Sequence, residues 1–193
     1  MTRHTRTPPE DAARAQGHER AEAAFSIREA TLADLPAIVA IYNSTVASRQ
    51  VTADTEPVSV ESRRAWFATH DAARRPLWVA ELDGVMLGWL SITDYKSRPA
   101  YSGTVEISLY LAAHARGRGI GSRLLMRAIE AAPGWGVHTL IGVVFAHNAP
   151  SVRLFDALGF AQWGRLPRVT VLDGVERDVL ILGRRADLQN KDR

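Results

Sequence analysis

The chain has 193 residues, which suits one compact domain, and its hydrophobic fraction of 46% is ordinary for a globular protein. It contains no cysteine, which excludes disulfides, thiolate metal sites and a cysteine nucleophile. The 24 basic and 21 acidic residues nearly balance and leave a net charge of +3, so the charge gives no case for a nucleic-acid partner.

The first 24 residues differ in composition from the rest. They are rich in Arg, Glu, Ala, Thr and Pro and have no large apolar residue between Met1 and Phe25, which predicts a disordered extension, with a short frayed helix as the alternative. They lack the apolar core of a signal peptide, and no stretch of the chain is apolar over the length of a membrane span. We therefore expect a cytoplasmic protein with no membrane partner, a domain at 25–185 and a C-terminal tail at 186–193.

From residue 25 the pattern is that of a folded domain. Thr31 begins a helix at a capping-box-like position, with Asp34 in place of the usual glutamate. Ser59 is a second N-cap candidate, and Asp83-Gly84 is a strong hairpin turn. In chain order, the first half predicts a strand at 25–28, a helix at about 32–46, a helix at 59–73, strands at 77–82 and 85–93, a polar loop at 94–103 and a strand at 104–111.

In the second half, helices and strands alternate. The predicted elements are a helix at 117–132, a strand at 137–145, a short helix at 150–158 ended by Gly159, and strands at 160–166 and 175–182 around the turn Asp173-Gly174. Antiparallel strands followed by a βαβ pattern predict one α/β domain with a mixed sheet.

A glycine-rich turn carries the clearest functional signal. Residues 116–121 read Arg-Gly-Arg-Gly-Ile-Gly, between a strand and a helix. Glycines let backbone N–H groups approach a ligand, and the helix N-terminus adds partial positive charge, which predicts a pyrophosphate site. The spacing fits neither a P-loop, which needs Lys-Ser or Lys-Thr after its second glycine, nor the dinucleotide fingerprint, whose third glycine comes one position later. Glycines that only permit tight packing remain the alternative.

Residues 116–121 resemble the acetyl-CoA signature of the GNAT superfamily of N-acetyltransferases. Further segments, in order along residues 25 to about 165, resemble its phosphinothricin and methionine sulfoximine acetyltransferases. These segments are Ile41-Tyr42-Asn43, Thr55-Glu56-Pro57, Arg98-Pro99-Ala100-Tyr101, the stretch 104–111, Asn148-Ala149-Pro150-Ser151 and Leu158-Gly159-Phe160. The resemblance implies a single-domain GNAT-like acyl-CoA N-acyltransferase fold, whose mostly antiparallel sheet contains a splayed parallel pair of strands that admits CoA.

The resemblance also implies acetyl-CoA as co-substrate. In this reading one strand offers its backbone to the pantetheine arm, the glycine turn holds the pyrophosphate, and the segment beginning at Asn148 binds pantetheine from the other side. The implied residues are Leu109, Tyr110, Leu111, Arg116, Gly117, Arg118, Gly119, Ile120, Gly121, Ser122, Asn148 and Ser151. The alternative for Asn148 is a helix cap. The histidines are scattered and no carboxylates cluster, so no metal is expected.

Glu106 is the predicted general base. Transfer of an acetyl group to an amine requires loss of the ammonium proton and polarisation of the thioester carbonyl. Glu106 lies in a run that otherwise reads as buried strand, where burial would raise its pKa toward the range of a working base. In relatives this glutamate is given that role, directly or through a water. The alternative is a solvent-facing glutamate in a surface ion pair. A backbone N–H near Leu109 or Tyr110 could polarise the carbonyl.

Two positions depart from the subfamily pattern. Phe155 stands where many relatives have a Tyr or His that could protonate the leaving thiolate, and the stretch 169–178 lacks the lysine and tryptophan of the subfamily's last hairpin. The second departure puts the acceptor in question more than the cofactor.

The loop before the strand of Glu106 is the candidate acceptor contact. Arg98 could pair with a carboxylate, phosphinate or sulfonyl-like group, and Tyr101 could hydrogen-bond or stack on the acceptor. A solvated basic loop is the alternative. The predicted function is acetylation of a small-molecule amine, the α-amine of an amino-acid analogue, by a homodimer of the kind the subfamily often forms. The alternatives are a protein N-terminal or lysine acetyltransferase and a non-catalytic acyl-CoA-binding module.

Overall fold

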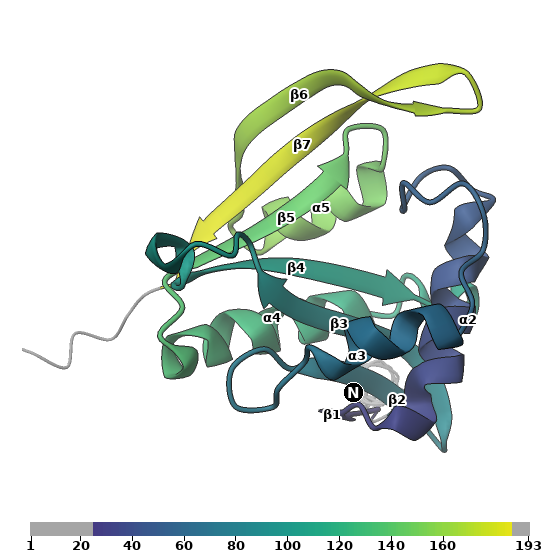
Figure 1. The fold of residues 1–193 in the computed structure, drawn as a ribbon, viewed down its shortest axis with the longest axis vertical. Helices are drawn as coiled ribbons and strands as arrows, with labels where there is room; N and C mark the ends of the chain where they lie inside the picture. The colour runs from purple at the N-terminus through teal and green to yellow at the C-terminus, as the bar shows by residue number, and fades with distance from the viewer. Residues whose placement is uncertain (1–24, 187–193) are drawn as a thin grey trace, which may run out of the picture.

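The computed structural model describes residues 25–186, which form a seven-stranded sheet with helices on both faces (Figure 1). The predicted extension at 1–24 and residues 187–193 of the predicted tail lie outside the described residues. The strands are β1 (Ser26–Glu29), β2 (Leu77–Leu82), β3 (Val85–Asp94), β4 (Thr104–Leu111), β5 (Thr139–Phe145), β6 (Ala161–Leu172) and β7 (Val175–Arg185); the longer helices are α2 (Leu35–Val46), α3 (Arg64–Ala68), α4 (Ile120–Ala131) and α5 (Ala149–Ala157).

The strand order β1-β2-β3-β4-β5-β7-β6 confirms the predicted mixed sheet. Every neighbouring pair is antiparallel except β4 and β5, which run parallel. β4 pairs with β3 from Val105 to Leu111, but it pairs with β5 only through residues 104–106. The rest of β5 continues beside β7. The parallel pair therefore splays apart after Glu106, as predicted, and leaves one edge of β4 without a neighbouring strand.

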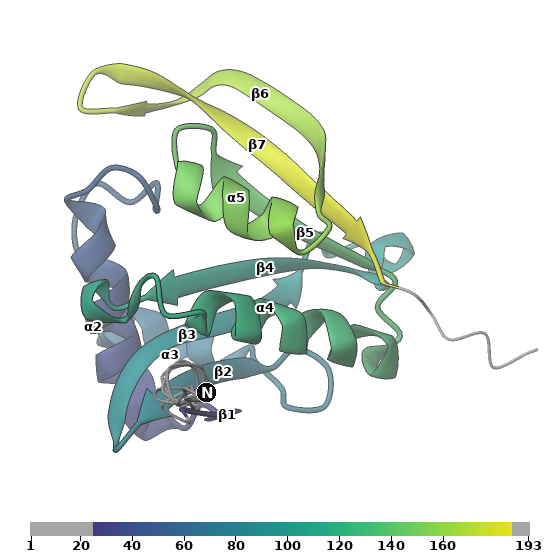
Figure 2. The same ribbon diagram turned by 180° about the vertical axis from the view of Figure 1, so that it is seen from behind.

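The helices divide between the two faces of the sheet. α2 and α3 lie over one face (Figure 1), and α4 and α5 lie over the other (Figure 2). Leu124 and Leu125 of α4 are fully buried against the sheet. On the opposite face the indole N–H of Trp89 donates to the carbonyl of Ile38 at 3.1 Å, which ties α2 to β3. Both layers are thus fixed against the central strands that border the splay.

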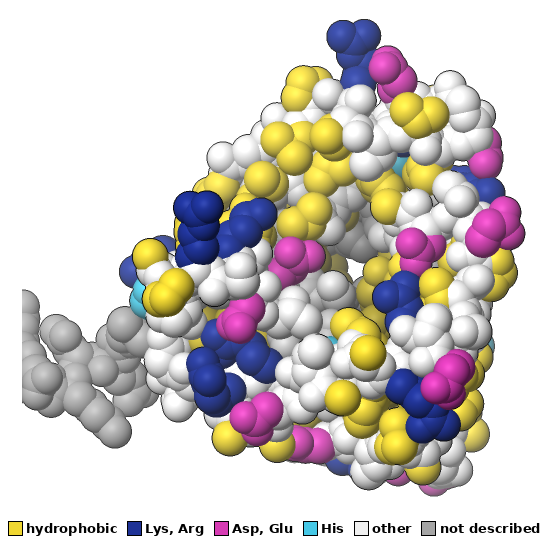
Figure 3. All heavy atoms as spheres, in the orientation of Figure 1, with side chains coloured by type: hydrophobic (Ala, Val, Ile, Leu, Met, Phe, Trp, Pro, Cys, Tyr) yellow, Lys and Arg dark blue, Asp and Glu magenta, His cyan; other side chains and the backbone are white. Residues whose placement is uncertain are grey.

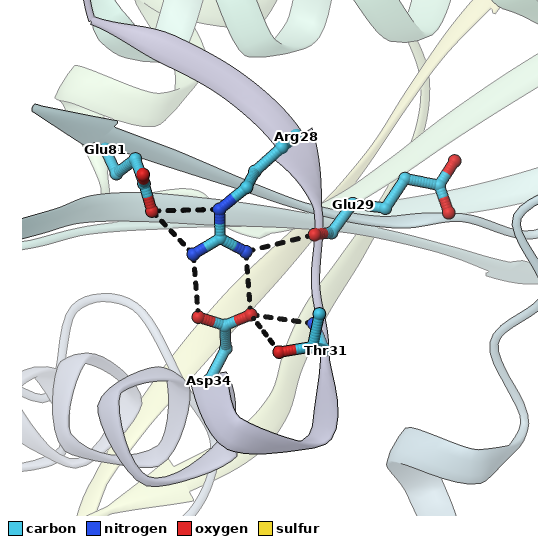
Figure 4. Close-up of polar contacts among 5 residues, drawn as sticks. All are labelled: Arg28, Glu29, Thr31, Asp34 and Glu81. Carbon is cyan, nitrogen blue, oxygen red and sulfur yellow. Dashed lines mark hydrogen bonds and ion pairs between the residues drawn. The ribbon is translucent and has the colours of Figure 1, made fainter. Parts of the chain in front are cut away.

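An ion-pair network fixes the start of the domain (Figure 4). The Arg28 guanidinium contacts the carboxylates of Asp34 at 2.8 Å and Glu81 at 2.5 Å. Asp34 also accepts a hydrogen bond from the backbone N–H of Thr31 at 2.7 Å, which confirms the capping interaction predicted there. Arg28 lowers the pKa of Asp34 to about 2. The network links β1, β2 and the turn that leads into α2.

The second helix is shorter than the sequence predicts. Helix was expected over 59–73. The structure instead has a short 3₁₀ turn over Glu61–Arg63, followed by α3, which ends at Ala68. The following residues turn back through a β-bridge between Asp71 and Arg75. The buried Arg75 side chain then donates to Asp94 at 2.7 Å and to the carbonyl of Ser102 at 2.9 Å. These long-range bonds, which the local pattern does not show, hold the segment after the helix against β3 and the loop that follows it.

Other boundaries also differ from the prediction; β5 begins at Thr139 and not at 137, and β7 continues to Arg185, beyond the predicted 182. α4 begins at Ile120 and not at 117, because Gly117 and Gly119 have left-handed φ angles of 73° and 75° that a helix cannot contain. β6 continues to Leu172, beyond the predicted end at 166. Its pairing with β7 shifts register between Leu166 and Thr170. The proline-containing segment between them therefore forms an irregularity within the strand and does not end it.

Candidate functional site

A cavity of about 410 Å³ opens where β4 and β5 splay apart. Its walls come from the end of β4, the glycine turn and the N-terminal turn of α5. Figure 2 shows the N-terminal ends of α4 and α5 on the same side of the molecule. All the residues predicted to bind the cofactor line this cavity except Arg118. Gln50, Val51 and Arg153 also line it, although no sequence motif marks them.

The glycines of the turn divide into two kinds. A Cβ added at Gly117 or Gly119 would meet no atom within 4 Å, so both positions face open space. At Gly121 a Cβ would lie 3.2 Å from Leu154 and 3.4 Å from Leu109, so this glycine lets the start of α4 pack closely on β4 and α5. The packing interpretation therefore fits Gly121. Gly117 and Gly119, which line the cavity, leave room for a ligand beside the unpaired N–H groups of the first helical turn.

Asn148 caps α5, and its side chain also borders the cavity. Its Oδ1 accepts a hydrogen bond from the backbone N–H of Ser151 at 3.2 Å, which caps α5. The side chain is buried and also borders the cavity. Its Nδ2 makes no hydrogen bond to any residue that the structure describes, so this amide can donate into the cavity.

A second cavity of about 200 Å³ lies on the other face of β4, beneath α2 and α3. Ser91 and Thr93 of β3 and Ser108 and Tyr110 of β4 form its floor. A smaller space of about 50 Å³ lies between β4 and β5, and Tyr110 borders all three. Figure 3 shows a hollow in this face, between the β6–β7 hairpin and the helices α2 and α3. The splay therefore brings a cavity on one face of the sheet next to a cavity on the other.

Glu106 lies at the end of the row that floors the second cavity. Successive side chains of a strand alternate between faces, so Glu106 shares its face with Ser108 and Tyr110. Across the sheet it is paired with Thr93, which lines the cavity. Glu106 does not itself line any of the three spaces. Burial raises the pKa of its carboxyl, while the nearby Lys96 ammonium opposes that shift. Over residues 25–186 its carboxylate has no ion-pair partner, contrary to the surface-pair alternative.

Arg98 and Tyr101 lie outside all three spaces. Tyr101 belongs to a short 3₁₀ turn over Pro99–Tyr101, and both side chains are exposed. The Tyr101 ring packs edge-on against Tyr95, with the ring centroids 6.1 Å apart. The structure does not bring these two residues together with Glu106 at a common cavity, and their contact with an acceptor stays a prediction.

Phe155 reaches the space between the splayed strands. The ring is buried, packs edge-on against Phe160 at 4.8 Å and lies against Gly142, where a Cβ would come within 2.5 Å of it. A phenyl ring has no proton to donate. Two side chains near in sequence do carry a proton, Tyr110 and His147; Tyr110 borders the same space, and burial raises the pKa of its hydroxyl. The His147 Nε2 instead contacts the carbonyl of Arg49 at 2.8 Å.

Sequence reasoning missed the other wall of the second cavity. This wall consists of Tyr42 from α2, Arg63 from the 3₁₀ turn before α3, and Trp66 from α3. Tyr42 belongs to a segment that resembles the subfamily, which was a signal without an assigned role. Arg63 carries no motif, and its placement depends on how α3 packs against the sheet.

Residues 25–186 contain no group of three or more His, Asp or Glu side chains that could hold a metal ion. In that same range, no helix has both the length and the apolar character needed to cross a membrane.

Residues 38–160 match the family model described as "Acetyltransferase (GNAT) family". YwnH of Bacillus subtilis, provisionally named a phosphinothricin acetyltransferase, is 48% identical over 161 residues, which are 83% of this chain and 98% of that protein. The L-methionine sulfoximine/L-methionine sulfone acetyltransferase of Pseudomonas aeruginosa is 39% identical over 145 residues, 75% of this chain and 84% of that protein. A Sinorhizobium meliloti phosphinothricin acetyltransferase solved in complex with acetyl-CoA has a TM-score of 0.81 at 28% identity, covering 88% of this chain and 92% of that one. These matches confirm the predicted fold.

Proposed function

Because the chain belongs to the acetyltransferase (GNAT) family, we propose that it transfers the acetyl group of acetyl-CoA to the α-amine of a small amino-acid analogue such as phosphinothricin, methionine sulfoximine or methionine sulfone. The observation that carries this proposal is the splay of β4 and β5, which brings a cavity for the cofactor against a cavity for the acceptor. The names of the relatives support the acceptor class.

The residues around the larger cavity fit acetyl-CoA. The open backbone at Gly117 and Gly119 suits a pyrophosphate, and Arg116 adds positive charge beside it. The unpaired edge of β4 at Leu109–Leu111 can hydrogen-bond an extended amide chain as a neighbouring strand would. Asn148 offers its Nδ2 from the opposite wall. Acetyl-CoA supplies the acetyl group already activated as a thioester, so no nucleophile of the chain is required.

Glu106 then removes the proton of the acceptor ammonium, directly or through a water. A neutral amine is the attacking species, and a carboxylate whose pKa is raised by burial is a stronger base than a solvated one. A backbone N–H of Leu109 or Tyr110 polarises the thioester carbonyl. Since Phe155 cannot protonate the leaving sulfur, the thiolate departs unprotonated, which a thiol pKa of about 8.5 permits.

We expect Arg98 to contact the polar side-chain end of the acceptor. Arg98→Ala should raise the KM for phosphinothricin or methionine sulfoximine about tenfold or more, since a hydrogen bond to a charged group is worth roughly 1.5–3 kcal/mol. The KM for acetyl-CoA should change far less. Arg98→Lys should rescue only in part, because an ammonium cannot make the planar bidentate contact. Steady-state kinetics on wild type and the two variants check this. Equal acceptor KM values would show that the loop is a solvated surface that does not contact the acceptor.

The homodimer is proposed from an exposed apolar surface on the β6–β7 hairpin. Val169 and Val171 lie two residues apart on one face of β6 and are 55% and 60% exposed. Clustered apolar side chains of this kind mark association surfaces. The double variant Val169→Asp/Val171→Asp should sediment as a monomer while the wild type sediments as a dimer. Val85→Asp, equally exposed on the β2–β3 turn, is the control and should stay dimeric. A monomeric wild type would contradict the proposal.

The proposed acceptor class is tested by release of the CoA thiol with a panel of amines. The panel contains phosphinothricin, methionine sulfoximine, methionine sulfone, ordinary amino acids, and peptides with a free N-terminus or lysine. We expect the highest kcat/KM with an amino-acid analogue. Turnover confined to peptides would favour a protein acetyltransferase, and acetyl-CoA binding without turnover on any amine would favour a non-catalytic binding module.

A further inference from the structure

The cavity beneath α2 and α3 has the lining of a site for an amphipathic anion. Among the residues that line it, Arg63 is the one cationic side chain. Trp66, Trp89 and Tyr110 supply flat apolar surface. A ligand for such a site has an anionic group that meets the guanidinium and a body that packs on the aromatic walls.

Neighbouring side chains hold the Arg63 guanidinium in place. Its Nη2 donates to Asp54 at 2.8 Å, and the group lies over the ring of Tyr42, 5.1 Å from the centroid. The Tyr42 hydroxyl donates to the same Asp54 oxygen at 2.6 Å and contacts Thr52 at 2.5 Å. Asp54 uses one of the five guanidinium N–H groups, and the others make no hydrogen bond to residues 25–186. The cation is therefore oriented in advance and keeps donors for a ligand.

The opposite wall of the cavity is polar and leads to Glu106. The hydroxyls of Ser91, Thr93 and Ser108 make no hydrogen bond within the described range, and Ser91 is only 2% exposed. Ser91 and Ser108 are directly paired across the strands, and the next pair on the same face is Thr93 with Glu106. A ligand that spans the cavity thus has hydroxyls at one end, with Glu106 next to them in the strand row, and a guanidinium near the other end.

We propose that Arg63 binds the α-carboxylate of the acceptor, so that the cavity selects α-amino acids over amines that lack a carboxylate. Asp54 and Tyr42 orient the guanidinium, and the α-amine lies toward Ser108 and Glu106, where the splay opens. Arg63 is a specificity-determining residue in this arrangement and takes no part in proton transfer. The inference rests on the proposed acetylation of amino-acid analogues, and it assigns to Arg63 a different group of the acceptor from the one assigned to Arg98.

Paired acceptors test the contact. Acceptor KM is measured for methionine sulfone and for its α-carboxamide, with wild type, Arg63→Ala, Arg63→Lys and Arg64→Ala. Arg63→Ala should raise the KM for the acid roughly tenfold or more, and the KM for the carboxamide by much less. Arg63→Lys should recover part of the loss. Arg64→Ala removes the neighbouring arginine, which is exposed and pairs with Glu61, and should behave as wild type. The KM for acetyl-CoA should stay constant throughout.

Equal losses for acid and carboxamide would overturn the inference, because they would show that Arg63 only supports the fold. Unchanged KM values for both would overturn it as well. If no small amine is acetylated, the contact between Arg63 and the carboxylate can still be tested by calorimetry, which measures the binding of methionine sulfone in the presence of CoA. Binding by the wild type that is lost in Arg63→Ala would support the carboxylate site although the proposed reaction had failed. Equal binding by wild type and Arg63→Ala would overturn the site on its own.

Discussion

Glu106→Gln should lower kcat at neutral pH by roughly two to four orders of magnitude, which is the usual contribution of a general base. The glutamine has nearly the same shape, so the β3–β4 pairing around Thr93 should persist and the affinity for acetyl-CoA should change little. Steady-state kinetics together with a binding isotherm for acetyl-CoA measure both quantities. Glu130→Gln, on the partly exposed face of α4, is a matched control that should keep the wild-type rate.

The pH dependence gives this prediction a specific signature. A base acts only when deprotonated, so wild-type kcat should rise with pH through the pKa of Glu106, which burial places above the ordinary glutamate value. Glu106→Gln should lack that limb of the profile, and its deficit should shrink at high pH, where the free amine becomes abundant. A variant with the full rate at neutral pH, or with a profile parallel to wild type, would assign the base to another group.

Gly119→Asp should severely weaken acetyl-CoA binding. Gly119 has a left-handed φ of 75° at the N-cap of α4, and a Cβ there meets open space that faces the cavity. Aspartate tolerates this backbone conformation better than most residues, so the fold should survive. Its carboxylate would face the pyrophosphate, and like charges in contact cost several kcal/mol, so affinity should fall roughly a hundredfold or more.

Gly119→Asn separates charge from shape. Asparagine has the same size as aspartate and an equal tolerance for left-handed backbone, but it carries no charge. It should therefore retain most of the acetyl-CoA affinity measured by calorimetry. Equal, severe losses in both variants would point to crowding of the turn, and unchanged affinity in a folded Gly119→Asp protein would place the cofactor elsewhere.

Local sequence patterns predicted much of the fold because they act over a few residues. The turns Asp83-Gly84 and Asp173-Gly174 both have positive φ at each residue, as their sequences predict for tight hairpins. The bounds of β2 and β4 follow directly from their apolar runs. The turn that follows α3 could not be predicted, since Arg75 there bonds to Asp94 and Ser102, which are distant in the chain.

The parts of the candidate site that are contiguous in the sequence could be predicted, and the parts assembled from distant segments could not. The glycine turn and the Asn148 segment are contiguous motifs, and their residues line one cavity apart from Arg118. The acceptor cavity is assembled from α2, α3, β3 and β4, so no single segment contains it. Arg98 is close to Glu106 in sequence but lies on an exposed turn, whereas Arg63, more than forty positions from Glu106 along the chain, lines the cavity. Sequence proximity to Glu106 therefore did not predict which arginine lines this cavity.

The most direct test of the central claim is the identity of the product formed from acetyl-CoA and methionine sulfone. Mass spectrometry and NMR of the reaction should show release of CoA and an equal amount of sulfone that carries one acetyl group on its α-nitrogen. Acetyl-CoA that binds but keeps its acetyl group with every amino-acid analogue, or acetyl groups found only on peptide N-termini or lysines, would contradict the account.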